Sequence, residues 1–274
     1  MGDEVPGVGA HARYVPGRFA DQVALVTGGG SGIGAAVARQ LAAEGCARVN
    51  VADQDMDNAE SVAVAMGGTA RHVDVADADA VDALVSGVTR DCGRLDVVVH
   101  AAGVDDPEAK AQLLSAREAG EPVDVLARLG DERWRRVMSV NLDGTFHVLR
   151  AAVRAMRPRG RGAVVTVGSS AAFDTLVGYP HYAASKAGVH ALSQAVAKEA
   201  IAFGVRVNTV APGPVDTAMA ARTPAAVRAA MEAAGAIGYA SAEDLADSIC
   251  YLASPGAANV VGAVLLSNGG RFTV

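Results

Sequence analysis

The chain has 274 residues, enough for one α/β domain with a sizeable core, and it is 51% hydrophobic but only 4% aromatic. Its net charge of −6 argues against general nucleic-acid binding, and no apolar run approaches the roughly 20 residues that span a bilayer. The three cysteines lie far apart and are odd in number, which favours free thiols in a reducing, cytoplasmic setting over a disulfide framework.

The first 19 residues differ in character from the rest of the chain. They contain acidic residues, glycine, proline and arginine, and they lack the apolar centre of a signal peptide. We therefore expect a flexible leader over residues 1–19 and a single domain over residues 20–274.

From residue 21 onward, short apolar runs alternate with segments of helical periodicity. Runs that are apolar on both faces are typical of buried parallel strands, so the pattern predicts an α/β, doubly wound, seven-stranded parallel sheet with helices on both faces. The predicted strands are Val23–Thr27, Arg48–Ala52, Ala70–Val73, Leu95–His100, Ala163–Gly168, Val205–Val210 and Val264–Leu266. The predicted helices are Gly32–Glu44, Asp57–Ala65, Asp77–Asp91, Glu132–Met156, Tyr182–Phe203 and Ala242–Ala253.

Two segments interrupt the alternation, Asp105–Gly130 and Pro212–Ala240. Both follow strands at the carboxyl edge of the predicted sheet, where open α/β folds bind ligands, so both are candidates for substrate contact. The first is polar and contains a possible helix around Glu108–Glu118. A surface insertion or an oligomer contact remains an equally good interpretation of it.

A glycine-rich turn joins the first strand to the first helix. Gly28, Gly32 and Gly34 leave the backbone free to turn tightly, and they let a pyrophosphate approach the helix N-terminus, where unpaired N–H groups favour an anion. Glycines alone are weak evidence, but strand, turn and helix together predict a dinucleotide site.

An acidic residue follows the second strand at the position that such a site requires. Asp53 lies 19 residues after Gly34, which suits a carboxylate that binds the adenosine ribose hydroxyls. It would repel a 2′-phosphate, and Ser31 stands in the turn instead of a basic residue, so NAD is favoured over NADP. The alternative is that Asp53 only caps the next helix. Asp74, after the third strand, is a weaker candidate for the adenine edge.

Tyr182 and Lys186 are four residues apart and therefore share one face of a predicted helix. A phenol is a poor base at neutral pH, but a neighbouring ammonium and an oxidised nicotinamide would lower the pKa of Tyr182. The phenol would then exchange a proton with an alcohol or carbonyl oxygen. Lys186 would also donate to the ribose hydroxyls.

Two further polar residues are candidates for the same site. Ser169 ends a strand 13 residues before Tyr182 and would hold the substrate oxygen; Ser170 is its immediate rival. Asn141 lies inside a predicted helix, where asparagine is a mediocre helix former. It would either hold a water that links Lys186 to solvent or satisfy a core backbone group.

The pattern Thr27-Gly28-x-x-x-Gly32-x-Gly34, followed in order by Asn141, Ser169, Tyr182 and Lys186, resembles the short-chain dehydrogenases/reductases over roughly Asp21–Gly270. The resemblance implies a single-domain Rossmann fold and a catalytic tetrad of Asn141, Ser169, Tyr182 and Lys186. The cofactor-binding residues that we expect are Gly28, Ser31, Gly32, Ile33, Gly34, Asp53, Asp74, Val75, Ala102, Gly103, Tyr182, Lys186, Pro212, Gly213, Val215 and Thr217. No metal site is expected.

The chain departs from the family pattern in two places. The family usually carries Asn-Asn-Ala-Gly after its fourth strand, whereas this chain has His100-Ala-Ala-Gly103, which puts the local hydrogen bonding in doubt. The separation of Gly103 and Asn141, 38 positions, is longer than is usual in the family. We therefore interpret residues 105–130 as an insertion near the active-site mouth.

The resemblance implies an NAD-dependent oxidoreductase that transfers a hydride between the nicotinamide and a secondary alcohol or ketone. Alternatives are a 3-oxoacyl-thioester reductase, a non-catalytic NAD-binding sensor or scaffold, and a nucleotide-sugar epimerase or dehydratase. The expected partner is a small-molecule substrate, without nucleic acid or membrane. A homo-oligomer, tetramer or dimer, would form through the two long helices, and Phe173, Tyr179 and Met219 are candidates for apolar pocket lining.

Overall fold

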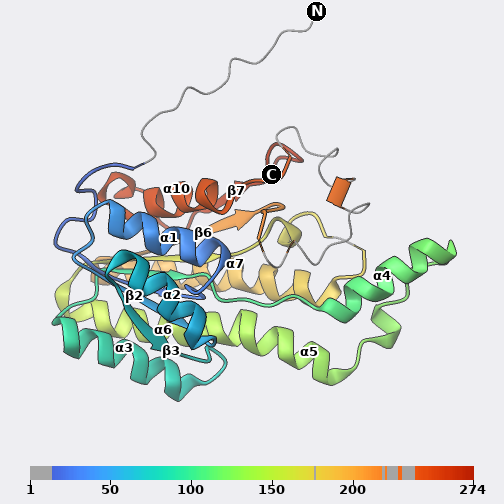
Figure 1. Ribbon diagram of the computed structural model, residues 1–274, viewed down its shortest axis with the longest axis horizontal. Helices are drawn as coiled ribbons and strands as arrows, with labels where there is room; N and C mark the ends of the chain where they lie inside the picture. Colours follow the sequence, from blue (N-terminus) through green and yellow to red (C-terminus); the bar gives the residue numbers. More distant parts are fainter. Residues whose placement is uncertain (1–13, 176, 218–219, 221–227, 230–237) are drawn as a thin grey trace, which may run out of the picture.

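The computed structural model describes residues 14–175, 177–217, 220, 228–229 and 238–274, and within them the chain forms one seven-stranded parallel sheet (Figure 1). The strands lie in the order β3-β2-β1-β4-β5-β6-β7, so the direction of winding reverses between β1 and β4. Ligands of open α/β sheets bind at such a reversal. The strands are β1 Val23–Thr27, β2 Arg48–Asp53, β3 Thr69–His72, β4 Val97–His100, β5 Gly162–Val167, β6 Val205–Pro212 and β7 Val264–Ser267. The predicted fold class is confirmed.

The helices lie where the periodicity predicts them, with one interruption. They are α1 Gly32–Ala43, α2 Met56–Met66, α3 Ala78–Cys92, α4 Pro107–Ala119, α5 Asp131–Met138, α6 Gly144–Met156, α7 Pro180–Ala200 and α10 Ala242–Ala253. The helix expected over Glu132–Met156 is divided by a π-helical turn, Ser139–Asp143, which joins α5 to α6. Among the described residues, no helix is both long and apolar enough to cross a membrane.

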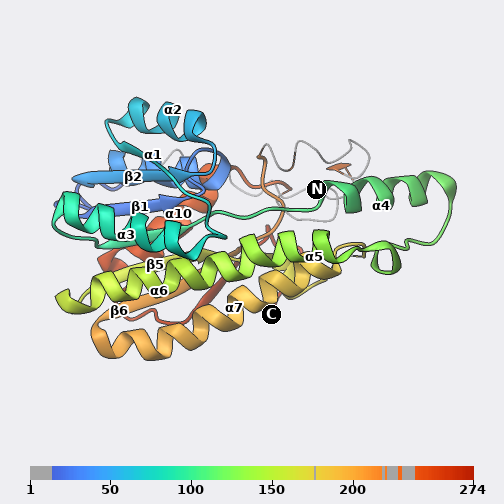
Figure 2. The same ribbon diagram turned by 90° about the horizontal axis from the view of Figure 1, so that it is seen from below.

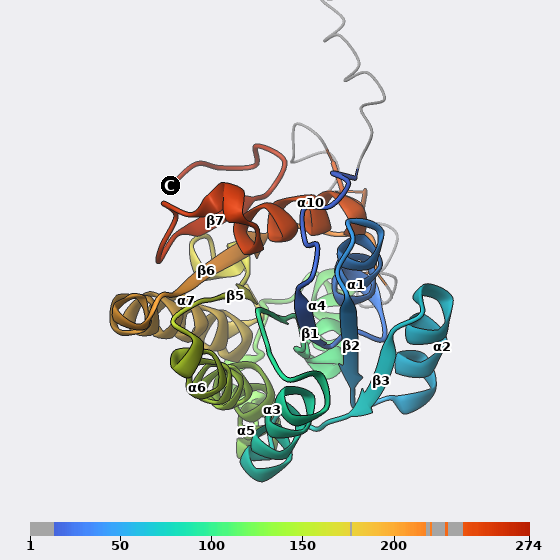
Figure 3. The same cartoon turned by 90° about the vertical axis from the view of Figure 1, so that its left-hand side faces the viewer.

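Alternate residues of each strand point to opposite helical layers. In β1, Ala24 and Val26 pack with α1, α2 and α10, whereas Val23 and Leu25 pack with α3, α6 and α7. Figure 3 shows these two layers on either side of the sheet. Because both faces are covered, the central strands β1, β4 and β5 are almost wholly apolar, as the sequence pattern predicts.

The segment 105–130 extends away from the body of the domain, and α4 is its main element (Figures 1 and 2). Asp106 caps this helix, Pro107 occupies its first turn, and Gly120 ends it with a φ of 66°. These are ordinary start and stop signals, and they explain why α4 is slightly longer than the expected Glu108–Glu118 helix.

Part of the expected leader packs against the domain. Residues 1–13 lie outside the described part of the chain, but Phe19 is fully buried in the core cluster beneath α1 and α10. Arg18 forms an ion pair of 3.0 Å with the buried carboxylate of Glu44. The packed structure therefore begins before residue 20.

Candidate active site

The glycine turn between β1 and α1 is packed so closely that side chains would not fit. Gly28 has a φ of 68°, and a Cβ there would lie 2.5 Å from the Ala102 backbone nitrogen. A Cβ on Gly34 would collide with the carbonyl oxygen of Gly28. The turn is thus closed on itself and lies against the end of β4, and the first N–H groups of α1 are left at its rim.

Asp53 at the end of β2 binds the turn directly. Its Oδ2 accepts a hydrogen bond of 2.9 Å from Gly30 N, and its Oδ1 accepts one of 3.0 Å from Asp55 N. The cap of α2 is Asp55, which accepts from Asn58 N. The interpretation of Asp53 as a mere helix cap is therefore wrong, and its half-buried carboxylate lies at the edge of the turn.

Other expected cofactor-binding residues surround the turn. Thr217, after β6, lies close to it, since a Cβ on Gly32 would be 3.3 Å from the Thr217 Cγ2. Ser31 is exposed at the start of α1, and its hydroxyl makes no capping bond within the described structure. Asp74 Oδ1 accepts a hydrogen bond from Ala76 N and so stabilises the loop in which it lies.

The remaining expected cofactor-binding residues have structural contacts of their own. The carbonyl of Val75 is bonded to His147 Nδ1 at 3.0 Å, and Gly213 packs against Asn268. Val215 is buried and Ile33 packs on the core. The contact of Val75 ties the turn after β3 to α6, and that of Gly213 ties the turn after β6 to the end of β7.

Ser169, Tyr182 and Lys186 converge at the carboxyl end of β5. The Lys186 Nζ lies 5.9 Å from the centre of the Tyr182 ring and donates a 2.9 Å hydrogen bond to the Val167 carbonyl. A Cβ on Gly103 would lie 3.4 Å from the same Nζ, so the end of β4 closes over the lysine. The structure thus places Ser169, Tyr182 and Lys186, which were selected by their spacing in the sequence, close to one another.

The pKa values of Tyr182 and Lys186 are shifted by burial. Burial raises the pKa of Tyr182; a hydrogen bond from Ser169 lowers that pKa, and the nearby Asp105 carboxylate raises it. Burial also lowers the pKa of Lys186 to about 8. The expected lowering of this pKa by the lysine and an oxidised nicotinamide together stays a prediction, while within the protein itself desolvation of the phenol is the largest influence.

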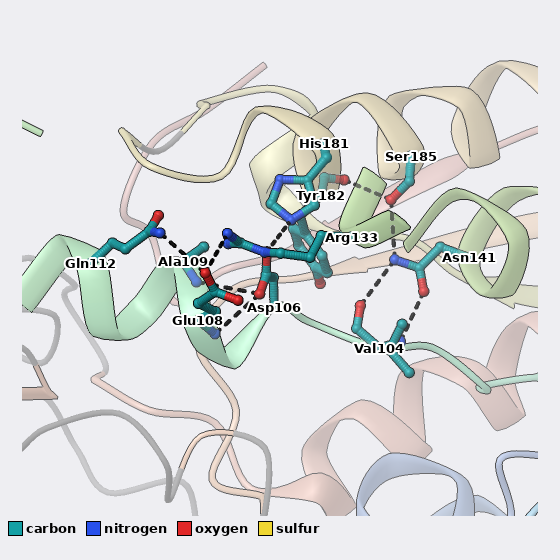
Figure 4. A network of polar contacts seen from close by, with 10 residues as sticks. All are labelled: Val104, Asp106, Glu108, Ala109, Gln112, Arg133, Asn141, His181, Tyr182 and Ser185. Carbon is teal, nitrogen blue, oxygen red and sulfur yellow. Dashed lines mark hydrogen bonds and ion pairs between the residues drawn. The ribbon is translucent and has the colours of Figure 1, made fainter. Parts of the chain in front are cut away.

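Asn141 lies in the π-helical turn, and its side chain satisfies backbone groups. Its Oδ1 accepts from Val104 N at 2.8 Å, while its Nδ2 donates to the Val104 carbonyl at 3.0 Å and to Ser185 Oγ at 3.1 Å (Figure 4). Ser185 Oγ in turn donates to the Tyr182 carbonyl. Of the two roles expected for Asn141, the bonding of a backbone group fits this geometry. The bond to Ser185 also ties Asn141 to the helix that carries Tyr182.

His100 replaces an asparagine of the family pattern and is buried. Its Nδ1 is 2.7 Å from Thr27 Oγ1, and burial, with Lys186 nearby, lowers its pKa to about 3. The ring is therefore neutral, and it links the ends of β4 and β1. Its Nε2 has no hydrogen-bond partner among the described residues.

Sequence reasoning missed two groups around the site. His190 accepts a hydrogen bond of 3.3 Å from Ser169 N, and its ring lies 5.1 Å from that of Phe173. Asp106, at the start of the insertion, bonds to Arg133 and to His181, the residue before Tyr182 (Figure 4). The Asp-Pro start signal of α4 could have identified Asp106, but its partners are distant in the sequence.

A cavity of about 520 Å³ lies between the insertion and the start of α7. It is lined by Val123, Val125, Leu126, Ala172, Thr175, Val177, Gly178, Pro180, Ala183, Ala184 and Ala187. Residues of the segment 105–130 thus form part of its wall, whereas the expected lining residues Phe173 and Tyr179 do not. Of the second segment, Pro212–Ala240, most residues after Thr217, Met219 among them, lie outside the described part of the chain.

Comparison with known proteins covers nearly the whole chain. A family model for short chain dehydrogenases matches residues 22–228. The cis-4-hydroxycyclohexanecarboxylate dehydrogenase of Sinomonas cyclohexanicum is 42% identical, over 93% of this chain and 98% of that protein. The 3-oxoacyl-[acyl-carrier-protein] reductase FabG of Escherichia coli (strain K12) is 31% identical, over 93% and 99%. The solved structure of ribose-5-phosphate isomerase from Brucella melitensis 16M has a TM-score of 0.84 and 32% identity, over 94% of each chain.

Proposed function

The chain belongs to the short-chain dehydrogenase/reductase family, and on that premise we propose that it is an NAD-dependent dehydrogenase of secondary alcohols. The family consists of oxidoreductases that act on alcohols and ketones with a nicotinamide cofactor. The observation that carries the finer proposal is the convergence of Ser169, Tyr182 and Lys186 beside a glycine turn that carries a carboxylate at its edge.

The glycine turn fits a dinucleotide pyrophosphate. Any side chain at Gly28 or Gly34 would fill the space that the turn needs, and Gly32 has a φ of 49° at the first position of α1. The N–H groups of that helix end, together with the exposed Ser31 hydroxyl, would bind the phosphates.

Asp53 supports NAD over NADP. Its carboxylate, fixed by Gly30 N at 2.9 Å, would accept hydrogen bonds from the two ribose hydroxyls. A 2′-phosphate at the same place would meet a negative charge, and Ser31 supplies no positive charge to offset it.

Tyr182 would move the proton of the reaction. Its raised pKa keeps the phenol neutral near pH 7, so it is ready to protonate a carbonyl oxygen. For the reverse direction, the hydrogen bond from Ser169 and the positive charge of Lys186 would favour the phenolate that accepts the alcohol proton. The bound nicotinamide supplies the hydride chemistry.

Ser169 and Asn141 would hold this arrangement in place. The Ser169 hydroxyl would bond to the substrate oxygen as well as to Tyr182, and so would orient the carbinol carbon. Asn141 would fix the first turns of α7 through Ser185, since that hydroxyl also bonds to the Tyr182 carbonyl.

The relatives suggest an alicyclic secondary alcohol as the substrate. The relative that is 42% identical is named for a hydroxylated cyclohexane ring that bears a carboxylate. The cavity of about 520 Å³ beside α7 is lined by neither Ser169, Tyr182 nor Lys186, so the name of this relative alone supports the substrate class.

A 3-oxoacyl-thioester reductase is the second candidate, because FabG of E. coli is 31% identical over 93% of the chain. The Asp53 carboxylate disfavours NADP, the coenzyme that such reductases usually use, and therefore argues against this candidate function. One similar structure is named as an isomerase, but the glycine turn of this chain favours a reaction that uses a dinucleotide.

The test is direct. Purified protein is mixed with NAD and a panel of secondary alcohols that includes cis- and trans-4-hydroxycyclohexanecarboxylate, and the absorbance of reduced nicotinamide is followed. We expect turnover of cyclic alcohols with NAD and much slower turnover with NADP. Tight NAD binding without turnover of any alcohol would favour the sensor, and reduction of 3-oxoacyl thioesters with NADPH alone would favour the reductase.

A further inference from the structure

A buried carboxylate at the start of the insertion is bonded to the residue that precedes Tyr182. Asp106, Arg133 and His181 form this group, which we call the Asp106 latch (Figure 4). We propose that Asp106, acting through His181, positions Tyr182, so that the insertion is part of the proton-transfer machinery and not only a surface decoration. The inference rests on the proposed function.

The two oxygens of Asp106 have different partners. Oδ1 accepts from the backbone nitrogens of Glu108 at 3.0 Å and Ala109 at 3.3 Å, and so caps α4. Oδ2 accepts from Arg133 Nε at 3.0 Å and Nη2 at 2.6 Å, and it is 2.9 Å from His181 Nε2. One carboxylate therefore joins α4, α5 and α7.

Charge and protonation fix the direction of these bonds. Burial disfavours the ionised form of Asp106, but the hydrogen bonds of Arg133 and of the Ala109 backbone hold its pKa below the ordinary value. Burial lowers the pKa of His181. An ionised carboxylate only accepts, so the neutral ring donates from Nε2. Its Nδ1 is buried and has no partner within the described structure, so the bond to Asp106 is the ring's one hydrogen bond there.

The start of α7 is held from two sides, by Asn141 through Ser185 and by Asp106 through His181. The helix begins at Pro180, and Tyr179 at its cap position makes no side-chain capping bond among the described residues. His181 and Tyr182 both lie in the first helical turn, and His181 is completely buried. A movement of the His181 ring would therefore carry the Tyr182 backbone with it.

Such a movement has a chemical consequence at Tyr182. The hydrogen bond from Ser169, on the turn after β5, lowers the pKa of the phenol. Ser169 is not on α7, so a displaced first turn would lengthen or break that bond while Ser169 stays in place. The pKa of Tyr182 would then rise, and the reacting groups would lose their alignment.

The experiment compares Asp106→Asn with Asp131→Asn. The asparagine at 106 keeps an oxygen for the α4 cap but places an amide nitrogen against the donors of Arg133 and His181. Asp131 is on α5 and bonds to Arg135 at 2.8 Å, but it is exposed, so its variant is the matched control. The measurements are kcat and its pH profile for alcohol oxidation, dinucleotide Kd, and thermal unfolding.

We expect Asp106→Asn to lower kcat roughly tenfold to a hundredfold, as for a misplaced reacting group. The alkaline rise of kcat should move to higher pH by at least about half a unit, because the phenol loses its hydrogen bond. Dinucleotide Kd should stay near the wild-type value, and the Asp131→Asn protein should match the wild type in every measurement.

His181 supplies a second test if Asp106→Asn does not fold. His181→Gln keeps a buried nitrogen that donates to Asp106, whereas His181→Leu does not. We expect the glutamine variant to retain most of the activity and the wild-type pH profile, and the leucine variant to show the loss and the shift. Equal behaviour of the two variants would overturn the inference.

A purely structural role would give a different result from a positioning role. It would reduce the folded fraction, measured by dinucleotide binding sites per chain, and would leave the pH profile of the remaining enzyme unchanged; that outcome overturns the inference. If the wild-type protein oxidises no alcohol and reduces no ketone, the proposed function fails instead, so the two failures are distinguishable.

Discussion

The two sides of the candidate site are built in different ways. On the dinucleotide side, the backbone does most of the work: Gly28 lies against Ala102, Gly34 lies against the Gly28 carbonyl, and Gly30 N bonds to Asp53. On the proton-transfer side, side chains from distant segments are bonded to one another. Asn141 reaches Ser185 across 44 residues of sequence, and Asp106 reaches His181 across 75.

This difference indicates which substitutions each side of the site tolerates. The dinucleotide side has no room for a Cβ at its glycines, but it asks little of its side chains apart from Asp53. The proton-transfer side depends on the charge and the hydrogen bonds of single side chains, several of them buried. Substitutions should therefore separate into those that change coenzyme binding and those that change catalysis or its pH dependence.

The largest effect is expected for Tyr182→Phe. The variant keeps the aromatic ring against Lys186 but loses the hydroxyl, so kcat should fall by about 10²–10⁴-fold. The affinity for NAD, measured by titration, should remain near the wild-type value because the glycine turn is untouched. A variant that retains most of its kcat would show that the two sides are not divided in this way.

The next effect concerns Gly34→Ala. The added Cβ would collide with the Gly28 carbonyl, so the turn must open. We expect a loss of about 1–3 kcal/mol in the free energy of unfolding, together with loss of NAD binding.

Gly87→Ala is the matched control for that variant. Gly87 lies within α3, and a Cβ there would meet only the Arg90 Nη2, at 3.7 Å, among the described residues. We expect a gain of about 0.5–1 kcal/mol and unchanged NAD binding. Equal behaviour of the two alanine variants in unfolding experiments would contradict the packing argument.

The buried lysine makes stability depend on pH in a way that the dinucleotide side does not. The pKa of Lys186 is about 8 in the folded protein and 10.5 ordinarily, so folding disfavours the charged form. The resulting cost, about 3 kcal/mol, is fully present below pH 8 and disappears as the pH rises to 10.5, because the unfolded chain then also releases the proton.

Lys186→Met should remove this cost. The lost hydrogen bond to the Val167 carbonyl offsets about 1 kcal/mol, so the variant should be about 2 kcal/mol more stable than the wild type at pH 7. The gain should shrink above pH 8 in unfolding experiments without dinucleotide. A gain that does not change with pH would mean that folding does not shift the pKa of Lys186.

The smallest effect is expected for Asp53→Ala. Loss of the carboxylate should weaken NAD binding roughly tenfold and narrow the preference over NADP. Asp55→Ala is the control, because Asp55 caps α2; it should cost about 1 kcal/mol of stability and leave the coenzyme preference unchanged. An unchanged NAD/NADP ratio in the Asp53 variant would refute the assignment of that residue.

The same difference between the two sides explains how much the sequence predicts. The strands, the glycine turn and Asp53 follow from local patterns: apolar runs, glycines before a helix, and a fixed spacing. Tyr182 and Lys186 also follow from a spacing, since four residues place them on one helix face. Each of these features lies within one short segment or in two consecutive strands.

The features that were missed come from long-range packing. The residues around Asn141 do not predict the π-helical turn, which forms where the Asn141 side chain bonds to Val104 after β4. The direction of the Tyr182 pKa depends on how deeply the phenol is buried, and the Asp106–His181 bond depends on the path of the insertion. Spacing in the sequence carries no information on either.

The central claim is that the glycine turn and Tyr182 serve one reaction, the transfer of a hydride and a proton between an alcohol and NAD. The most direct test uses the best alcohol of the panel, deuterated at its carbinol carbon, with mass spectrometry of the dinucleotide product. The account predicts reduced dinucleotide that carries the deuterium with the wild-type protein, and almost none with Tyr182→Phe although NAD still binds. Ketone formed without deuterium in the dinucleotide, or equal transfer by the variant, would contradict it.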